Sequence, residues 1–126
     1  MASSSRSGRA PARQDRGGQQ EEYCDELVYD ILKKMNQFKT DIKEDMDYLK
    51  GREVDWVDWE AERYSQGTIY NKLTKEVGDV QEILDSTPGY SSRESAKNKI
   101  IRKHEEVLNA QKRFNQLCER YLPPRR

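Results

Sequence analysis

The sequence predicts an all-α protein: three long helices in an up-down-up antiparallel bundle or in an extended coiled-coil arrangement, with a disordered N-terminal tail. Two observations support this fold class. Apolar side chains recur at alternating spacings of four and three residues along two long stretches, which is typical of helices that pack against helices. Charged residues make up 37% of the chain and hydrophobic residues 33%, a composition that suits narrow helical seams with wide solvated faces.

The chain begins with a polar segment, residues 1–18, that carries four arginines against one aspartate. It has no large apolar side chain after Met1, so it cannot bury enough surface to fold, and we predict a disordered basic tail. The first helix is predicted over about 19–50, with Gly51 as its stop. Asp45 alone interrupts its apolar seam, which comprises Cys24, Val28, Ile31, Met35, Phe38, Ile42 and Leu49.

The second helix is predicted over about 54–86 and has a less regular pattern. Its earlier apolar residues are out of phase with its later ones, and Gly67 lies near the junction. A kink or local unwinding over 65–68 is therefore one alternative. The Thr-Pro-Gly sequence at 87–89 ends the helix. The two stripes are Trp56, Val57, Trp59, Ala61 and Tyr64, and then Ile69, Leu73, Val77, Val80 and Leu84.

The third helix is predicted over about 92–122, between two clear boundary signals. Ser91 and Glu94 have the spacing of a capping box, and Pro123 prevents further helix, which leaves 123–126 as a basic tail. Its seam repeats the four-three spacing through Ala96, Ile100, Lys103, Val107, Ala110, Phe114, Leu117 and Tyr121.

The three helices have similar predicted lengths and short connections, at about 51–53 and 87–91, which favours antiparallel neighbours within one domain over 19–122. Folding the first two helices about residue 52 places Phe38 level with Gly67. In the alternative architecture, extended helices pair with other chains or with further copies of this one. The bundle resembles spectrin-type repeats and the N-terminal three-helix domains of syntaxins in architecture alone, so no residue roles follow.

The same register predicts the surroundings of two unusual residue types. It places Asp45 beside the segment 59–63, so we expect Arg63 to pair with this misplaced acid. It also places Cys24 and Cys118 at opposite ends of the bundle, too far apart for a disulfide, which predicts two free thiols.

A strongly acidic segment spans residues 41–62. It contains nine acids, three bases and both tryptophans. Tryptophan is a favoured anchor of protein interfaces. We therefore interpret this end as an acidic, aromatic tip that captures a basic helix or tail; in the alternative, Trp59 and Val57 simply close the bundle. The partner-binding candidates are Trp56, Trp59, Asp55, Asp58, Glu60 and Glu62.

The C-terminal segment 93–126 has the opposite charge, with ten bases against four acids. Together with the arginine tail it suggests an alternative function, the binding of nucleic acid or another polyanion. Its bases are spread around the predicted helix, however, and form no recognised DNA-reading motif, which favours a solvated helical face.

The sequence contains no group of residues with the pattern of a catalytic site. His104, the one histidine, has no cysteine or carboxylate at metal-ligand spacing, and its adjacent acids point elsewhere on a helix. No glycine-rich phosphate loop and no HExxH or CxxC motif occurs. We predict no catalytic residue, no metal ligand and no cofactor, and therefore a protein that is not an enzyme.

The predicted function is a non-catalytic, helical protein–protein interaction module. It would be a scaffold, small subunit or adaptor of an intracellular assembly of cytoskeletal, kinetochore or trafficking type, with other helical chains as partners. No apolar run reaches the roughly 18 residues of a membrane span. Because no apolar stretch follows the start, we expect no secretory signal and a cytoplasmic or nuclear location, with mitochondrial import as the alternative for an Arg/Ser-rich start.

Overall fold

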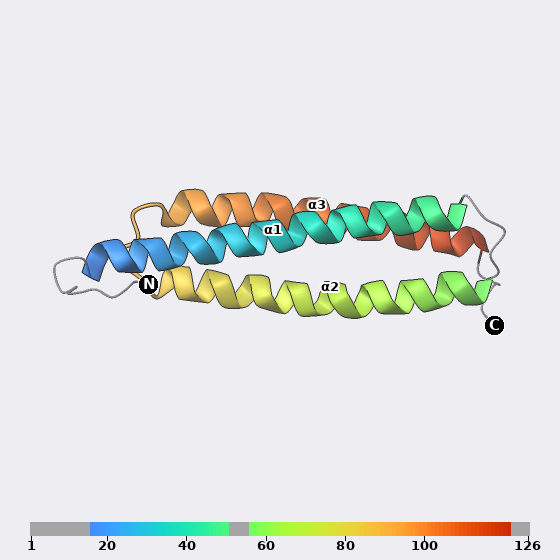
Figure 1. Cartoon of the computed structure of the whole chain (residues 1–126), viewed down its shortest axis with the longest axis horizontal. Helices are drawn as coiled ribbons and strands as arrows, with labels where there is room; N and C mark the ends of the chain where they lie inside the picture. The colour runs from blue at the N-terminus through green and yellow to red at the C-terminus, as the bar shows by residue number, and fades with distance from the viewer. Residues whose placement is uncertain (1–15, 51–55, 122–126) are drawn as a thin grey trace, which may run out of the picture.

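Three α-helices pack against one another in the structure, a computed structural model that describes residues 16–50 and 56–121. They are α1 (Arg16–Lys50), α2 (Trp56–Asp85) and α3 (Arg93–Tyr121). Figure 1 shows them lying lengthwise beside one another, with α2 running in the direction opposite to α1 and α3. The predicted all-α, up-down-up three-helix bundle is confirmed, and the described part of the chain contains no strand.

The helix boundaries lie within three residues of the predicted ones. α1 begins at Arg16 rather than at 19, so the last three residues of the predicted disordered tail are helical. The rest of that tail, the first interhelical connection and the basic segment 123–126 lie outside the described residues.

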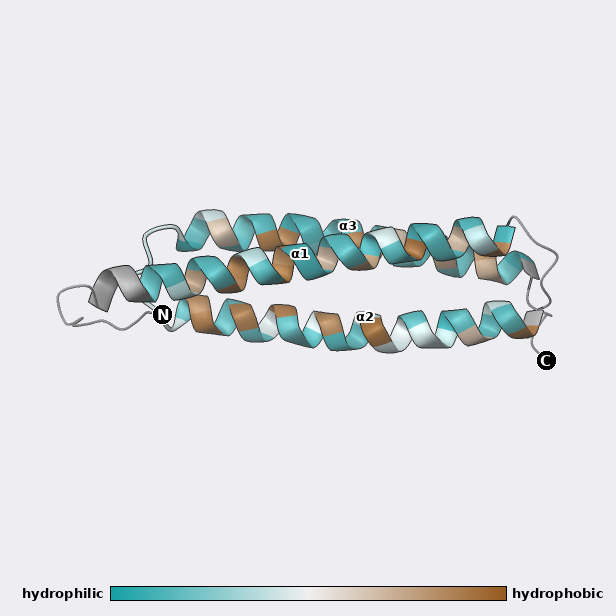
Figure 2. Ribbon diagram, viewed as in Figure 1, coloured by the Kyte–Doolittle hydropathy of each residue, from teal (hydrophilic) through white to brown (hydrophobic). Residues whose placement is uncertain are grey.

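The core is a single cluster that runs the length of the bundle between the three helices. Its members follow the heptad seams of α1 and α3, and Figure 2 shows apolar and hydrophilic residues alternating along the helices, as amphipathic packing requires. Leu117 is partly buried against this cluster, and the side chain of Tyr121 lies outside the described residues. The buried seam residues predicted for α1 and α3 are Val28, Ile31, Met35, Phe38, Ile42, Leu49, Ile100, Val107 and Phe114.

α2 is one continuous helix through Gly67, so the alternative of local unwinding at 65–68 is wrong. The residues of α2 that face the core follow a regular spacing once Gln66 is counted among them. This polar residue is buried, at 3% exposed, and a search for apolar residues overlooks it. Ile69 was predicted to lie on the stripe but is 49% exposed. The residues that face the core at four-three spacing are Trp59, Gln66, Tyr70, Leu73, Val77, Val80 and Leu84.

The register of α1 against α2 differs from the predicted one by about a turn. Phe38 packs against Tyr70, with 6.4 Å between ring centroids, rather than level with Gly67. The segment between the two helices, residues 51–55, lies outside the described residues.

The connection between α2 and α3 is anchored to the start of α1. Tyr90 is 5% exposed, and its hydroxyl donates a hydrogen bond to the Asp25 carboxylate at 2.6 Å. The backbone amide of Ser91, which a capping box would pair with Glu94, instead donates to the Glu21 carboxylate at 3.3 Å. The turn therefore contributes a core residue that no heptad pattern indicates.

Both cysteines are buried free thiols, one near the start of α1 and the other near the end of α3, as predicted. Cys118 is fully buried, whereas its neighbour Leu117 is only partly so. A straight helix drifts relative to a strict heptad, and this drift moves the buried face of α3 by one residue near its end. Burial raises the pKa of the Cys118 thiol to about 11.

Candidate functional site

The acid-rich end of the bundle contains the predicted partner-binding residues, but Trp59 is not on its surface. Trp59 is fully buried and packs against Phe114, with 6.1 Å between ring centroids. The Cys118 thiol also approaches the backbone carbonyl oxygen of Trp59 at 3.9 Å. Trp59 therefore closes this end of the core, as in the alternative interpretation, and does not present its ring to a partner. Val57, the other residue of that alternative, is 50% exposed.

The other candidates differ in their accessibility. Asp58 and Glu60 are exposed, and Glu62 is half-buried. Asp55 and the side chain of Trp56 lie outside the described residues. Asp58 and Glu60 therefore lie on the surface of this end of the bundle.

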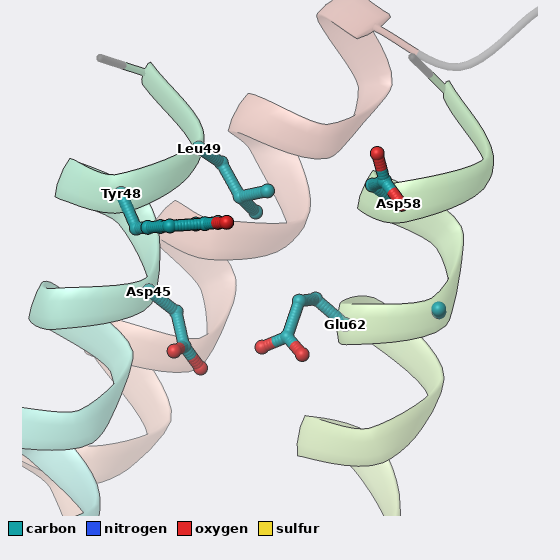
Figure 3. Close-up of a pocket in the computed structure, with 6 residues that line it drawn as sticks. Asp45, Tyr48, Leu49, Asp58 and Glu62 are labelled. Carbon is teal, nitrogen blue, oxygen red and sulfur yellow. The ribbon is translucent and has the colours of Figure 1, made fainter. Parts of the chain in front are cut away.

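A cavity of about 310 Å³ lies between α1 and α2 at this end; we call it the acidic pocket. Asp45 and Tyr48 line it from α1, and Asp58 and Glu62 line it from α2. In Figure 3, the carboxyl groups of Asp45 and Glu62 point toward one another across the space between the helices. Leu49 and Ala61 complete the lining.

Asp45 has a different partner from the one that the sequence predicted. It accepts a hydrogen bond from the Gln66 side-chain amide at 2.8 Å, not from Arg63. Gln66 lies just beyond the predicted segment 59–63, and the shift in register brings it to the level of Asp45.

The two facing carboxyl groups hold a proton near neutral pH. A hydrogen bond with Asp45, burial, and the charge of Asp45 together raise the pKa of Glu62 from 4.5 to about 7. Two carboxylates that share one site cannot both ionise easily. A positive charge placed between them would relieve this repulsion, so the pocket suits a cationic group.

A layer of buried polar side chains crosses the bundle beside the pocket. The Lys39–Glu106 contact joins α1 and α3 residues 67 apart, and this offset puts Asp45 level with about residue 112. Gln66 and Gln111 are buried, and each has a side-chain carbonyl oxygen without a hydrogen-bond partner. The four-three spacing of apolar residues does not indicate this layer, although amide side chains beside the seam are a weak signal of it.

The basic residues of α3 do not form a separate pole. Lys97 pairs with Asp85 at 2.7 Å, and Glu106 accepts hydrogen bonds from Lys39 at 2.6 Å and Lys103 at 3.0 Å. These bonds lower the pKa of Glu106 to about 2. Since α3 runs parallel to α1, the basic residues near its end lie at the same end of the bundle as the acidic segment, which offsets much of the charge separation seen in sequence.

His104 makes structural contacts. Its ring stacks on Tyr70, with 5.8 Å between centroids, and its Nε2 lies 3.0 Å from the Thr74 hydroxyl. Among the described residues, no cluster of three or more histidine, cysteine or acidic side chains has the geometry to hold a metal ion. No helix in the described part of the chain is long and apolar enough to cross a membrane.

Comparison of the chain with protein-family models, curated proteins and solved structures finds no match. The fold and the acidic pocket are therefore the basis for a functional proposal.

Proposed function

We propose that this three-helix bundle is a non-catalytic interaction module that binds a basic segment of a partner protein at its acidic end. The observation that carries the proposal is the acidic pocket, where Asp45 and Glu62 face one another beside exposed Asp58. Bundles bury their cofactors and reactive groups among facing helices, whereas this pocket opens at the outer edge of a closed core.

Electrostatic complementarity supports a cationic ligand for this pocket. A lysine or arginine of a partner would form charge-assisted hydrogen bonds with the carboxylates and remove their mutual repulsion. Arginine fits especially well, because its planar guanidinium bonds two carboxylates at once and stacks on an aromatic ring such as that of Tyr48. The proposed role is that of an adaptor or subunit in an intracellular assembly of cytoskeletal, kinetochore or trafficking type.

The test uses two isosteric double variants at different positions along α2. Asp58→Asn with Glu62→Gln replaces the two carboxyl groups that α2 contributes to the pocket. Asp79→Asn with Glu82→Gln replaces two exposed carboxyl groups at the other end of the helix. The tagged proteins are purified from cells and their co-purifying proteins quantified. We expect partners that the pocket variant loses and the control variant keeps; equal recovery with both variants would refute the proposal.

The alternative function is nucleic-acid or polyanion binding. The observation that favours it is that α3 carries three exposed bases, Lys99, Arg102 and Arg113. A salt titration of binding to a duplex DNA probe tests it. Polyanion binding would weaken by orders of magnitude between about 50 and 200 mM salt and would require these three bases.

A further inference from the structure

The seam between α1 and α2 carries a second hollow, next to the acidic pocket. This apolar hollow has a volume of about 270 Å³, and Phe38, Ile69 and Leu73 contribute its apolar lining. Ile69 is 49% exposed and does not belong to the buried core cluster. An isoleucine in this position offers apolar surface that a partner can cover.

The hollow and the pocket have a defined spacing along the seam. Glu62 and Ile69 are seven residues apart on α2, and Asp45 and Phe38 are seven residues apart on α1. Seven residues are two helical turns, or roughly 10 Å along the axis. A helix lying in the seam would therefore meet both features with residues of its own that are two turns apart.

The charges at the rim of the hollow favour the same kind of occupant. Lys34 and Glu76 form a 3.4 Å ion pair across the seam, and Asp41 and Lys72 complete a balanced rim. The acidic pocket beside it is lined by carboxyl groups of both helices. The seam thus presents a neutral, apolar part followed by an acidic part.

We propose that the α1–α2 seam is the docking groove for an amphipathic helix of a partner protein, which places an apolar side chain on Ile69 and, seven residues away, a lysine or arginine in the acidic pocket. The complex would then be a four-helix arrangement, built by the same packing that holds α1, α2 and α3 together. Charge complementarity selects a basic partner helix, and Ile69 fixes its position along the seam. This inference rests on the proposed function and specifies the contact that would perform it.

The test measures binding of the full chain to a designed, fluorescein-labelled amphipathic peptide of about 20 residues, long enough for a helix of roughly 30 Å. The peptide carries leucines on one face and an arginine seven residues from a leucine. A second peptide has glutamate in place of that arginine. Fluorescence anisotropy gives the dissociation constants.

Two protein variants separate seam docking from general stickiness. Ile69→Asn removes the apolar contact, and Ile101→Asn makes the same change on α3 at a residue of matched exposure, 49% against 47%. We expect Ile69→Asn to weaken binding of the arginine peptide by about tenfold or more, and Ile101→Asn to leave it within about twofold. The glutamate peptide should bind at least about tenfold more weakly than the arginine peptide.

Equal effects of the two asparagine variants, equal affinity for the two peptides, or no binding of the arginine peptide would overturn the inference. So would concentration-dependent dimerisation of the chain that Ile69→Asn abolishes, because the occupant would then be a second copy. A cellular partner lost with Asp58→Asn/Glu62→Gln but fully retained with Ile69→Asn would leave the proposed function standing and refute the seam as its docking groove.

Discussion

The carboxyl pair of Asp45 and Glu62 predicts an unusual pH dependence of stability. The native protein keeps a proton on Glu62 up to about pH 7, whereas the unfolded chain loses it near 4.5. Between these values the native state binds more protons than the unfolded state, so the free energy of unfolding falls as the pH rises. The contribution of this pair is fully present below about pH 4.5 and is lost as the pH rises through 7.

The size of this effect follows from the same two values. Each pKa unit corresponds to about 1.4 kcal/mol, so the difference between 4.5 and about 7 sets an upper limit of about 3.5 kcal/mol. Because Glu62 is only half-buried and the pocket is open to solvent, screening reduces the expected effect to about 1 kcal/mol.

Glu62→Gln isolates this contribution, because glutamine keeps the shape of the side chain and donates a hydrogen bond to Asp45 without ionising. Urea unfolding, followed by far-UV circular dichroism, measures both proteins at pH 5 and at pH 8.5. We expect similar stabilities at pH 5 and a variant that is about 1 kcal/mol more stable than the wild type at pH 8.5. A difference between the two proteins that is the same at both pH values would refute the reasoning, as would a variant that is less stable at pH 8.5.

Three further predictions concern the core and its polar layer. Phe114 is fully buried, so Phe114→Asp should cost more than about 4 kcal/mol and abolish the helical dichroism signal; a folded variant would contradict the packing. Gln111 has a buried carbonyl oxygen without a partner, so Gln111→Leu should raise the free energy of urea unfolding by about 1 kcal/mol, and a loss of stability would show that the amide is satisfied. Tyr90→Phe removes the bond to Asp25 and should cost about 1–2 kcal/mol in the same assay, whereas Tyr23→Phe, at a residue that is 54% exposed, should change nothing measurable.

The fold was predictable because the packing of this chain is largely local and periodic. The four-three spacing of apolar residues in α1 and α3 identified nearly all of their buried side chains. α2 was harder, because buried Gln66 interrupts its apolar stripe while exposed Ile69 and Val57 mimic one. The search for periodic apolar residues ignores polar ones. A polar residue in the core therefore makes it difficult to identify which residues of a helix face the core.

The candidate site was predictable only in outline. Net charge located the acidic end, but composition did not decide whether Trp59 closes the core or contacts a partner, and its burial decides for the core. The contact between Asp45 and Glu62 depends on how far α2 lies along α1, that is, on the register between the two helices. The shift in register changes the predicted partner of Asp45 from Arg63 to the side-chain amide of Gln66, and no local pattern fixes that choice.

The most direct test of the proposed role is an amide NMR titration of the isotope-labelled full chain with the arginine-containing amphipathic peptide. Docking in the α1–α2 seam predicts that the largest shift changes follow the seam, at Tyr48, Glu62 and Ile69, with small changes at Ile101. Changes concentrated on α3 around Arg113, or no changes at all, would contradict the account of this bundle as a receptor for a basic helix.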